Sequence, residues 1–307
     1  MIPRLLLGLC LAALANAGFA SEVETPRSAP FDIALPTDSP LVFRGAVSVL
    51  ADDEDFGGLS GMVIGAFGQI IAISDRARWA TFSLRIENGR LTGIDDLQTH
   101  PMITHKGQIG HGRNWDAEGM TLGPDGRLWV SFERVHRLQS FTSVTEPAGV
   151  ARRTKEWDKL PNNGGLEALA TSADGRLWAI EEQSVGAAHS FRVFVSGPSD
   201  VEVKHLPRHG EFSPTGADFG PDGWLYITER AFSLIGGFRV RLRRARWSDG
   251  AAPVADEQLA AFDAASNIDN IEAITVWEDD DKTYAVVLSD DNFNIFQRTV
   301  VALFEVE

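Results

Sequence analysis

Cysteine and positive charge are both scarce in this chain of 307 residues. The single cysteine, Cys10, lies in a segment that we expect to be removed, so the mature chain has no thiol. This excludes disulfides, thiol catalysis, and zinc or iron–sulfur centres bound by cysteine. The 28 Lys and Arg residues are outnumbered by 43 Asp and Glu residues, which gives a formal net charge of −15. Because nucleic-acid binding needs clustered basic residues, we expect no nucleic-acid partner.

Three catalytic signatures are also absent from the sequence. Ser60 stands in Gly-Leu-Ser-Gly-Met, which is not the Gly-x-Ser-x-Gly elbow of serine hydrolases, and no other serine fits that pattern. The chain has no phosphate-binding P-loop, and Gly110 and Gly112 lack the third glycine of a dinucleotide fingerprint. A hydrolase function would therefore have to rest on chemistry other than a serine nucleophile.

The first forty residues have the pattern of a targeting segment followed by a linker. Arg4 precedes an apolar run at residues 5–15, and small residues at 15 and 17 or at 18 and 20 suit cleavage. Because this run is too short to cross a bilayer, we expect a signal peptide over residues 1–20. We expect export to the periplasm or outside the cell, with no membrane anchor after cleavage. Residues 21–40 contain four prolines and are predicted to form an extended linker.

A hairpin motif recurs through the rest of the chain. The stretch Glu-Gly-Met-Thr-Leu-Gly-Pro-Asp-Gly-Arg-Leu-Trp begins at Glu118, and related copies begin at Ser60, Glu167, Thr215 and Glu272. The starts lie 58, 49, 48 and 57 residues apart. Most copies join two apolar strands through an Asp-Gly turn, which is the signal of a β-hairpin. Further strand-like runs follow each hairpin, so one unit holds about four strands, which is typical of propeller blades.

We therefore predict an all-β fold, a single β-propeller domain of four-stranded blades over residues 41–307. Five motif copies are visible, and the intervals between them are compatible with either five or six blades. Strand-like segments at residues 41–50 and 299–306 are expected to pair in one blade and close the ring. A β-sandwich also contains hairpins, but it gives no reason for the same turn and aromatic residue at fixed offsets.

The repeat places acidic side chains at one mouth of the predicted ring. A spacing of 15 residues separates Ser60 from Asp75, Glu118 from Glu133 and Glu167 from Glu182. In a propeller, two such positions lie side by side near the axis. The fourth and fifth copies end in Glu-Arg at 229–230 and in Asp-Asp-Asn at 290–292, displaced from this spacing. The carboxylates expected at the mouth are Asp75, Asp116, Glu118, Glu133, Glu167, Glu181 or Glu182, Glu229, Asp269, Glu272 and Asp290.

Carboxylates that share one mouth repel one another unless a cation lies between them. Hard cations prefer oxygen ligands, and several asparagines would add neutral ones: Asn114, Asn163, Asn270 and Asn292. We predict a divalent cation, Ca²⁺ first with Mg²⁺ or Mn²⁺ as alternatives. Its predicted ligands are Asp116, Glu118, Glu167, Glu272 and Asp290. The alternative interpretation is that these acids bind backbone N–H groups or neighbouring arginines.

An acid followed by arginine ends the second strand of three copies: Asp75-Arg76, Glu133-Arg134 and Glu229-Arg230. Arginine binds phosphate and carboxylate in a bidentate manner. We therefore predict that an anionic ester is bound by Arg76, Arg134, Arg230, Asn163 and Asn292. Structural ion pairs are the alternative role for these arginines.

Several segments resemble a bacterial family described as having the esterase-like activity of phytase. They are Asp-Ala-Glu-Gly at 116–119, Asn-Gly-Gly-Leu-Glu-Ala-Leu-Ala at 163–170, Pro-Asp-Gly to Glu-Arg at 221–230, Asn-Ile-Glu-Ala at 270–273 and Ser-Asp-Asp-Asn-Phe-Asn at 289–294. The resemblance covers roughly residues 41–306, and the last segment is its most specific part. It implies an exported β-propeller that hydrolyses a phosphate ester or another ester.

Together these features predict a monomeric, metal-dependent hydrolase of a small anionic ester, with a phosphate ester favoured. Glu118, Glu167 and Glu272 are the predicted catalytic residues. Two alternatives stay open. One is a lactonase-type hydrolase, which would use one cation and would not need the arginines. The other is a non-catalytic propeller that binds a ligand or a partner protein, since a fold does not decide a function.

Overall fold

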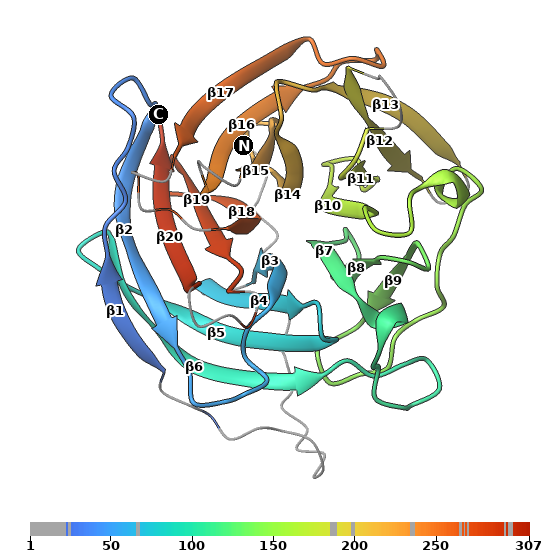
Figure 1. The fold of residues 1–307 in the computed structure, drawn as a ribbon, viewed down its shortest axis with the longest axis horizontal. Coiled ribbons are helices and arrows are strands. Elements are labelled where there is room, and N and C mark those ends of the chain that lie inside the picture. Colours follow the sequence, from blue (N-terminus) through green and yellow to red (C-terminus); the bar gives the residue numbers. More distant parts are fainter. Residues whose placement is uncertain are drawn as a thin grey trace, which may run out of the picture.

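Five antiparallel sheets surround one axis in the computed structural model of this chain (Figure 1). The structure describes residues 23, 26–65, 68–184, 189–197, 200–233, 237–263, 266, 268, 270–291, 293 and 297–307. The expected signal peptide, residues 1–20, lies outside the described residues. In the described part of the chain, no helix is long and apolar enough to cross a membrane.

The sheets follow one another along the chain as blades 1 to 5. Blade 1 consists of β3 (Leu59–Ile64), β4 (Gln69–Ser74), β5 (Arg78–Glu87) and β6 (Arg90–Pro101). Blade 2 follows a 3₁₀ turn, η2 (Arg113–Trp115), and consists of β7 (Ala117–Leu122), β8 (Leu128–Phe132) and β9 (Arg137–Phe141). Blade 3 follows η3 (Trp157–Lys159) and consists of β10 (Leu166–Thr171), β11 (Leu177–Glu181), β12 (Ser190–Ser196) and β13 (Val201–Pro207).

The last two blades complete the ring. Blade 4 consists of β14 (Ser213–Phe219), β15 (Leu225–Ser233), β16 (Gly237–Arg246) and β17 (Ala255–Phe262). Blade 5 contains β18 (Ile271–Asp279), β19 (Lys282–Ser289) and β20 (Thr299–Val306), followed in the sheet by β2 (Leu41–Leu50) and β1 (Arg27–Phe31). Strand β2 pairs antiparallel with β20, so chain segments from the two ends lie side by side in one blade.

The all-β propeller prediction is confirmed with five blades, but two blades differ from four strands. In blade 2, the segment at Arg152 bridges Leu138 through two backbone hydrogen bonds and takes the place of an outer strand. In blade 5, β1 adds a fifth strand from within the segment predicted as a linker. Pro30 fits there because an edge strand does not need every N–H to donate.

The core consists of five hydrophobic clusters, and each spans two neighbouring blades. Val63 and Trp79 of blade 1 pack with Met120 of blade 2, for example, and Ala170 of blade 3 packs with Ile227 of blade 4. Corresponding clusters join blades 2 and 3, blades 4 and 5, and blades 5 and 1. This packing holds the inner strands β3, β7, β10, β14 and β18 around the axis (Figure 1).

Candidate functional site at the axial mouth

Each inner strand has a β-bulge near its start, and the bulges hold the residues that begin the five motif copies. The pairing with the second strand skips Ser60, Glu167, Thr215 and Glu272, and in β7 it skips Glu118 together with Gly119. A bulge re-aims a side chain relative to a regular strand. Ser60, Glu167 and Glu272 line a narrow axial cavity of about 10 Å³, which has room for about one water molecule.

Small residues after the bulges allow the inner strands to approach one another closely. A Cβ atom at Gly216 would lie 2.8 Å from the carbonyl oxygen of Glu272. One at Gly61 would lie 2.9 Å from the backbone nitrogen of Met120. Both distances are too short for a real contact, so glycine is required for the narrow ring.

The residues that follow the second strands form another tier around the mouth. In four blades, the N–H of this residue donates to a carbonyl just before the inner strand: Asp75 to Gly58, Glu133 to Asp116, Glu182 to Gly165, and Asp290 to Asn270. In blade 4, Arg230 pairs with Ser213 at the equivalent place. The tier therefore contains four acids and one arginine.

The structure corrects the prediction that Glu229 lies at the mouth. Glu229 is fully buried in blade 4, where Arg241 binds one carboxylate oxygen and Nε of Arg243 lies 3.0 Å from the other. Glu181 is likewise buried and pairs with Arg192, which leaves Glu182 at the mouth. Neighbouring residues of a strand face opposite sides, so a displacement of one position moves a side chain away from the axis. Asp269 and Asn292 lie outside the described residues.

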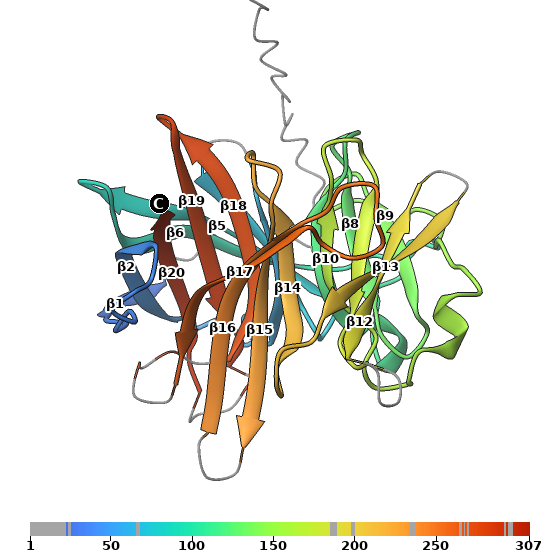
Figure 2. The ribbon, with the colours of Figure 1, turned by 90° about the horizontal axis from the view of Figure 1, so that it is seen from above.

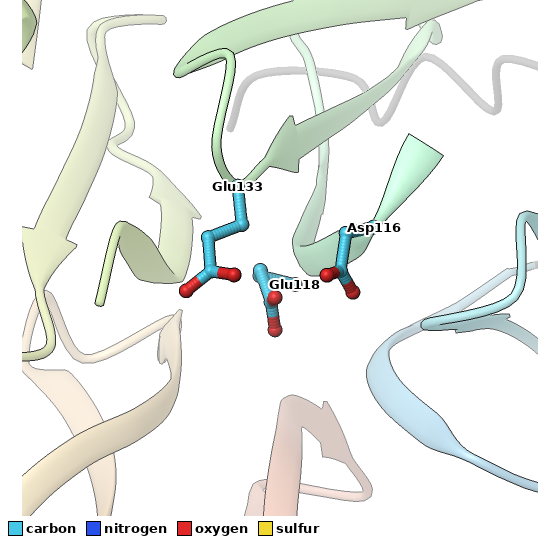
Figure 3. A group of neighbouring side chains, drawn as sticks. All are labelled: Asp116, Glu118 and Glu133. Atoms are coloured by element: carbon cyan, nitrogen blue, oxygen red, sulfur yellow. The ribbon is translucent and has the colours of Figure 1, made fainter. Parts of the chain in front are cut away.

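Three carboxylates converge at the blade 2 side of the mouth (Figure 3). Asp116, Glu118 and Glu133 each offer an oxygen atom, and these atoms lie within 4.8 Å of one another. Glu118 also lies within hydrogen-bonding reach of Glu167 of blade 3, and this contact contributes to the raised pKa of Glu118. Gly164 N–H donates to Glu133 Oε1 at 2.5 Å and fixes that side chain.

Burial makes these carboxylates hard to ionise. Burial and the charges of Glu167, Asp116 and Glu133 raise the pKa of Glu118 well above its usual value. The pKa of Glu167 is likewise raised well above its usual value, by burial and by the charges of Glu182 and Glu272. Burial also raises the pKa values of Asp116 and Glu133. Such a group of oxygen donors suits a hard cation, which would relieve the repulsion.

The structure groups the predicted metal ligands differently from the sequence interpretation. Asp116 and Glu118 belong to the convergent group and Glu167 contacts it, but among the described residues Glu272 and Asp290 are not members. Glu133 belongs to the group although it was expected only at the mouth. Its place 15 residues after Glu118 was the available signal.

Glu272 is held by two neighbours on the other side of the axial cavity. Arg230 Nη1 binds its Oε1 atom in a short ion pair, and Asn270 Nδ2 donates to the same oxygen at 2.7 Å. Arg230 Nη1 also donates to Asn270 Oδ1 at 2.8 Å. Burial raises the pKa of Glu272 to about 7, although Arg230 and Asn270 oppose the rise.

The predicted anion-binding residues are engaged to different degrees. Arg134 pairs with Asp116 at 3.2 Å, and its Nη2 lies 3.8 Å from Glu133. Arg230 pairs with Glu272, so both arginines form the ion pairs that the alternative interpretation expected. Arg76 lies over the ring of Phe293, with its central carbon 3.3 Å from the ring centroid. Asn163 is exposed, and its carbonyl accepts a hydrogen bond from Gln183.

Comparisons with known proteins agree with the sequence resemblance. The phytase-like family, described as having the esterase-like activity of phytase, matches residues 54–293. No curated protein matches the chain.

The solved structures that match this chain are only weakly similar to it. An inactive variant of virginiamycin B lyase from Staphylococcus aureus has 9% identity and a TM-score of 0.45, over 90% of this chain and 94% of that one. Aldose sugar dehydrogenase from Streptomyces coelicolor has 16% identity and a TM-score of 0.41, over 93% of this chain and 96% of that one. At these values the likenesses say nothing about function.

Proposed function

This chain belongs to the phytase-like family, and on that premise we propose that it is a metal-dependent ester hydrolase with its reaction centre at the axial mouth. The observation that carries the proposal is the convergence of oxygen atoms from Asp116, Glu118 and Glu133 within 4.8 Å, beside Glu167. The phosphate ester is the substrate class that we place first.

The residues present fit a divalent cation. Asp116, Glu118, Glu133 and Glu167 would together bring four negative charges to one place. The guanidinium of Arg134 offsets one of these, which leaves a formal charge of −3 when all four carboxylates are ionised. We propose Ca²⁺ as the first candidate, with Mg²⁺ or Mn²⁺ as alternatives. A cation held there would polarise the ester oxygen and stabilise the negative charge that develops in the transition state.

We assign proton transfer to Glu272. Its pKa of about 7 allows the carboxylate to accept a proton from the attacking water and to return it to the leaving alkoxide near neutral pH. Arg230 and Asn270 hold its Oε1 atom, so the side chain keeps one orientation toward the cavity that it lines with Glu167. For a phosphate ester, we propose that Arg76 binds a phosphate oxygen, because its guanidinium is placed by stacking on Phe293.

Hydrolysis of a lactone or another uncharged ester is a second candidate. The observation that favours it is that Arg134 and Arg230 already pair with Asp116 and Glu272. Such a substrate needs the cation and a proton acceptor but no arginine for an anionic group.

The experiment is a turnover assay of the mature chain after treatment with a chelator. Ca²⁺, Mg²⁺ or Mn²⁺ is then added back, with 4-nitrophenyl phosphate and a simple lactone as substrates. We expect cation-dependent turnover that falls at least 100-fold in Glu118→Gln. Glu87→Gln, an exposed acid at the end of β5, is the matched control and should keep full activity. Stabilisation by a cation without turnover of either substrate would instead indicate a binding propeller.

We also propose that the chain is exported and acts as a monomer. Mass spectrometry of protein recovered outside the cytoplasm should then find a chain that begins at residue 18 or 21. Retention of the first twenty residues would contradict export by cleavage.

A further inference from the structure

A pocket of about 420 Å³ lies beside the axial mouth, between blades 3 and 4. This volume is in the usual range for small-molecule sites. Its lining includes Glu182, Glu211, Ser213, Arg230, Phe232 and Phe238. The hairpin of β15 and β16 forms one wall, and Figure 2 shows it projecting beyond the neighbouring strands at the bottom of that view.

The pocket offers an aromatic surface to a ligand. Phe232 is 59% exposed, so its ring is accessible to a ligand in the pocket. Its ring centroid lies 5.0 Å from that of Phe238, with the two ring planes tilted by 51°. Two adjacent rings at this spacing give a flat apolar or aromatic group two surfaces to contact.

The positive charges at the pocket are already paired. Arg239, which follows the lining residue Phe238, binds Glu211 at 2.6 Å. Arg230 pairs with Glu272 and lies 3.8 Å from Glu182. Within the described lining, the two carboxylates of Glu182 and Glu211 outnumber the one guanidinium, that of Arg230. A ligand with many negative charges would therefore be repelled, whereas an uncharged aromatic group would not.

Arg230 connects this pocket with the proposed reaction centre. Arg230 lines the pocket, and its guanidinium binds Glu272 and Asn270 at the axial cavity. A molecule whose apolar group fills the pocket would thus have its other end beside Glu272.

We propose that this pocket binds the aromatic group of a small ester that carries at most one phosphate, with the ester bond at the axial mouth. The proposal rests on the proposed hydrolase function and names its substrate class. It also implies that inositol hexakisphosphate, with six phosphate groups, is not a substrate.

The first measurement is binding of 1-naphthol by isothermal titration, without added cation, so that turnover plays no part. We expect Phe232→Ala to raise the dissociation constant about tenfold, since it removes one of the two rings. Val254→Ala removes an exposed apolar side chain beside β17 of the same blade and should leave binding unchanged. An excess of inositol hexakisphosphate should not displace 1-naphthol. Equal binding by wild type and Phe232→Ala, or displacement by the polyphosphate, would overturn the proposal.

The second measurement is hydrolysis of 1-naphthyl phosphate and methyl phosphate with the cation that supports activity. Phe232→Ala should raise KM for the naphthyl ester about tenfold and leave kcat and the methyl ester unchanged. If 1-naphthol binding depends on Phe232 but neither ester is hydrolysed, the pocket stands and the hydrolase function fails. If both esters are hydrolysed with unchanged KM in Phe232→Ala, the pocket inference fails by itself.

Discussion

Replacing Glu272 by glutamine tests whether burial or ion pairing controls this carboxylate. Glu272 pairs with Arg230, so a simple count of ion pairs predicts that Glu272→Gln is less stable than wild type at pH 8. The raised pKa predicts the opposite. The carboxyl group of Glu272 binds its proton more tightly in the folded protein than in the unfolded chain. The reason is that burial destabilises the ionised form by more than the ion pair with Arg230 stabilises it.

The size of the effect follows from the pKa. Glu272 rises from a usual value of 4.5 to about 7, and this difference corresponds to about 3 kcal/mol at about 1.36 kcal/mol per pKa unit. Between those two pH values the folded state binds more protons than the unfolded state. Its free energy of unfolding therefore falls as the pH rises through this window and then stays level. Glutamine has no proton to lose, so the variant lacks this contribution to the pH dependence.

The assay is urea unfolding followed by tryptophan fluorescence at pH 5 and pH 8, with chelator present so that no cation offsets the charges. Glu272→Gln should match wild type within about 1 kcal/mol at pH 5 and exceed its stability by about 2–3 kcal/mol at pH 8. Glu87→Gln is the control, since Glu87 is exposed. Equal pH dependence in wild type and Glu272→Gln, or a variant less stable at pH 8, would refute the reasoning.

Three further results are expected from stability measurements on single variants. Ca²⁺ should raise the melting temperature of the chelator-treated wild type but not that of Glu118→Gln, and an equal rise in both would remove Glu118 from the cation site. Glu229→Gln should cost about 3–5 kcal/mol, because it leaves buried arginines without their partner, while the response to cation is kept. Gly216→Ala should cost about 1–3 kcal/mol through its contact with the Glu272 carbonyl, whereas Gly65→Ala, whose Cβ would lie at 3.5 Å, should cost less than about 1 kcal/mol. Urea unfolding measures both costs.

The fold was largely predictable because its signals are local. Asp-Gly turns and alternating apolar residues specify a hairpin within about a dozen residues, and the repetition of that hairpin indicates a propeller. Strand β1 was not predicted, since a proline-rich segment becomes an edge strand only when a partner such as β2 is present. The short blade 2 was also missed, because its outer position is taken by an irregular segment at Arg152.

Part of the site was predictable from spacing. The interval of 15 residues that links Glu118 to Glu133 also links Thr215 to Arg230, so the sequence contained the signal that Arg230, not Glu229, belongs at the mouth. No comparable pattern in the sequence predicts the β-bulges. Whether a residue sits in a bulge depends on its register with the facing strand, and one position decides which way the side chain points.

The amino-acid order alone was enough to specify the five visible hairpins and to place acids at one end of most of them, because these features depend on neighbours in the chain. The folded ring decided which acids meet. Glu118 contacts Glu167, and Arg230 binds Glu272, across blade boundaries and dozens of residues. The raised pKa values also arise only in the folded state, since they require the removal of water by residues from several blades. Chemistry at the mouth is therefore a property of the assembled ring.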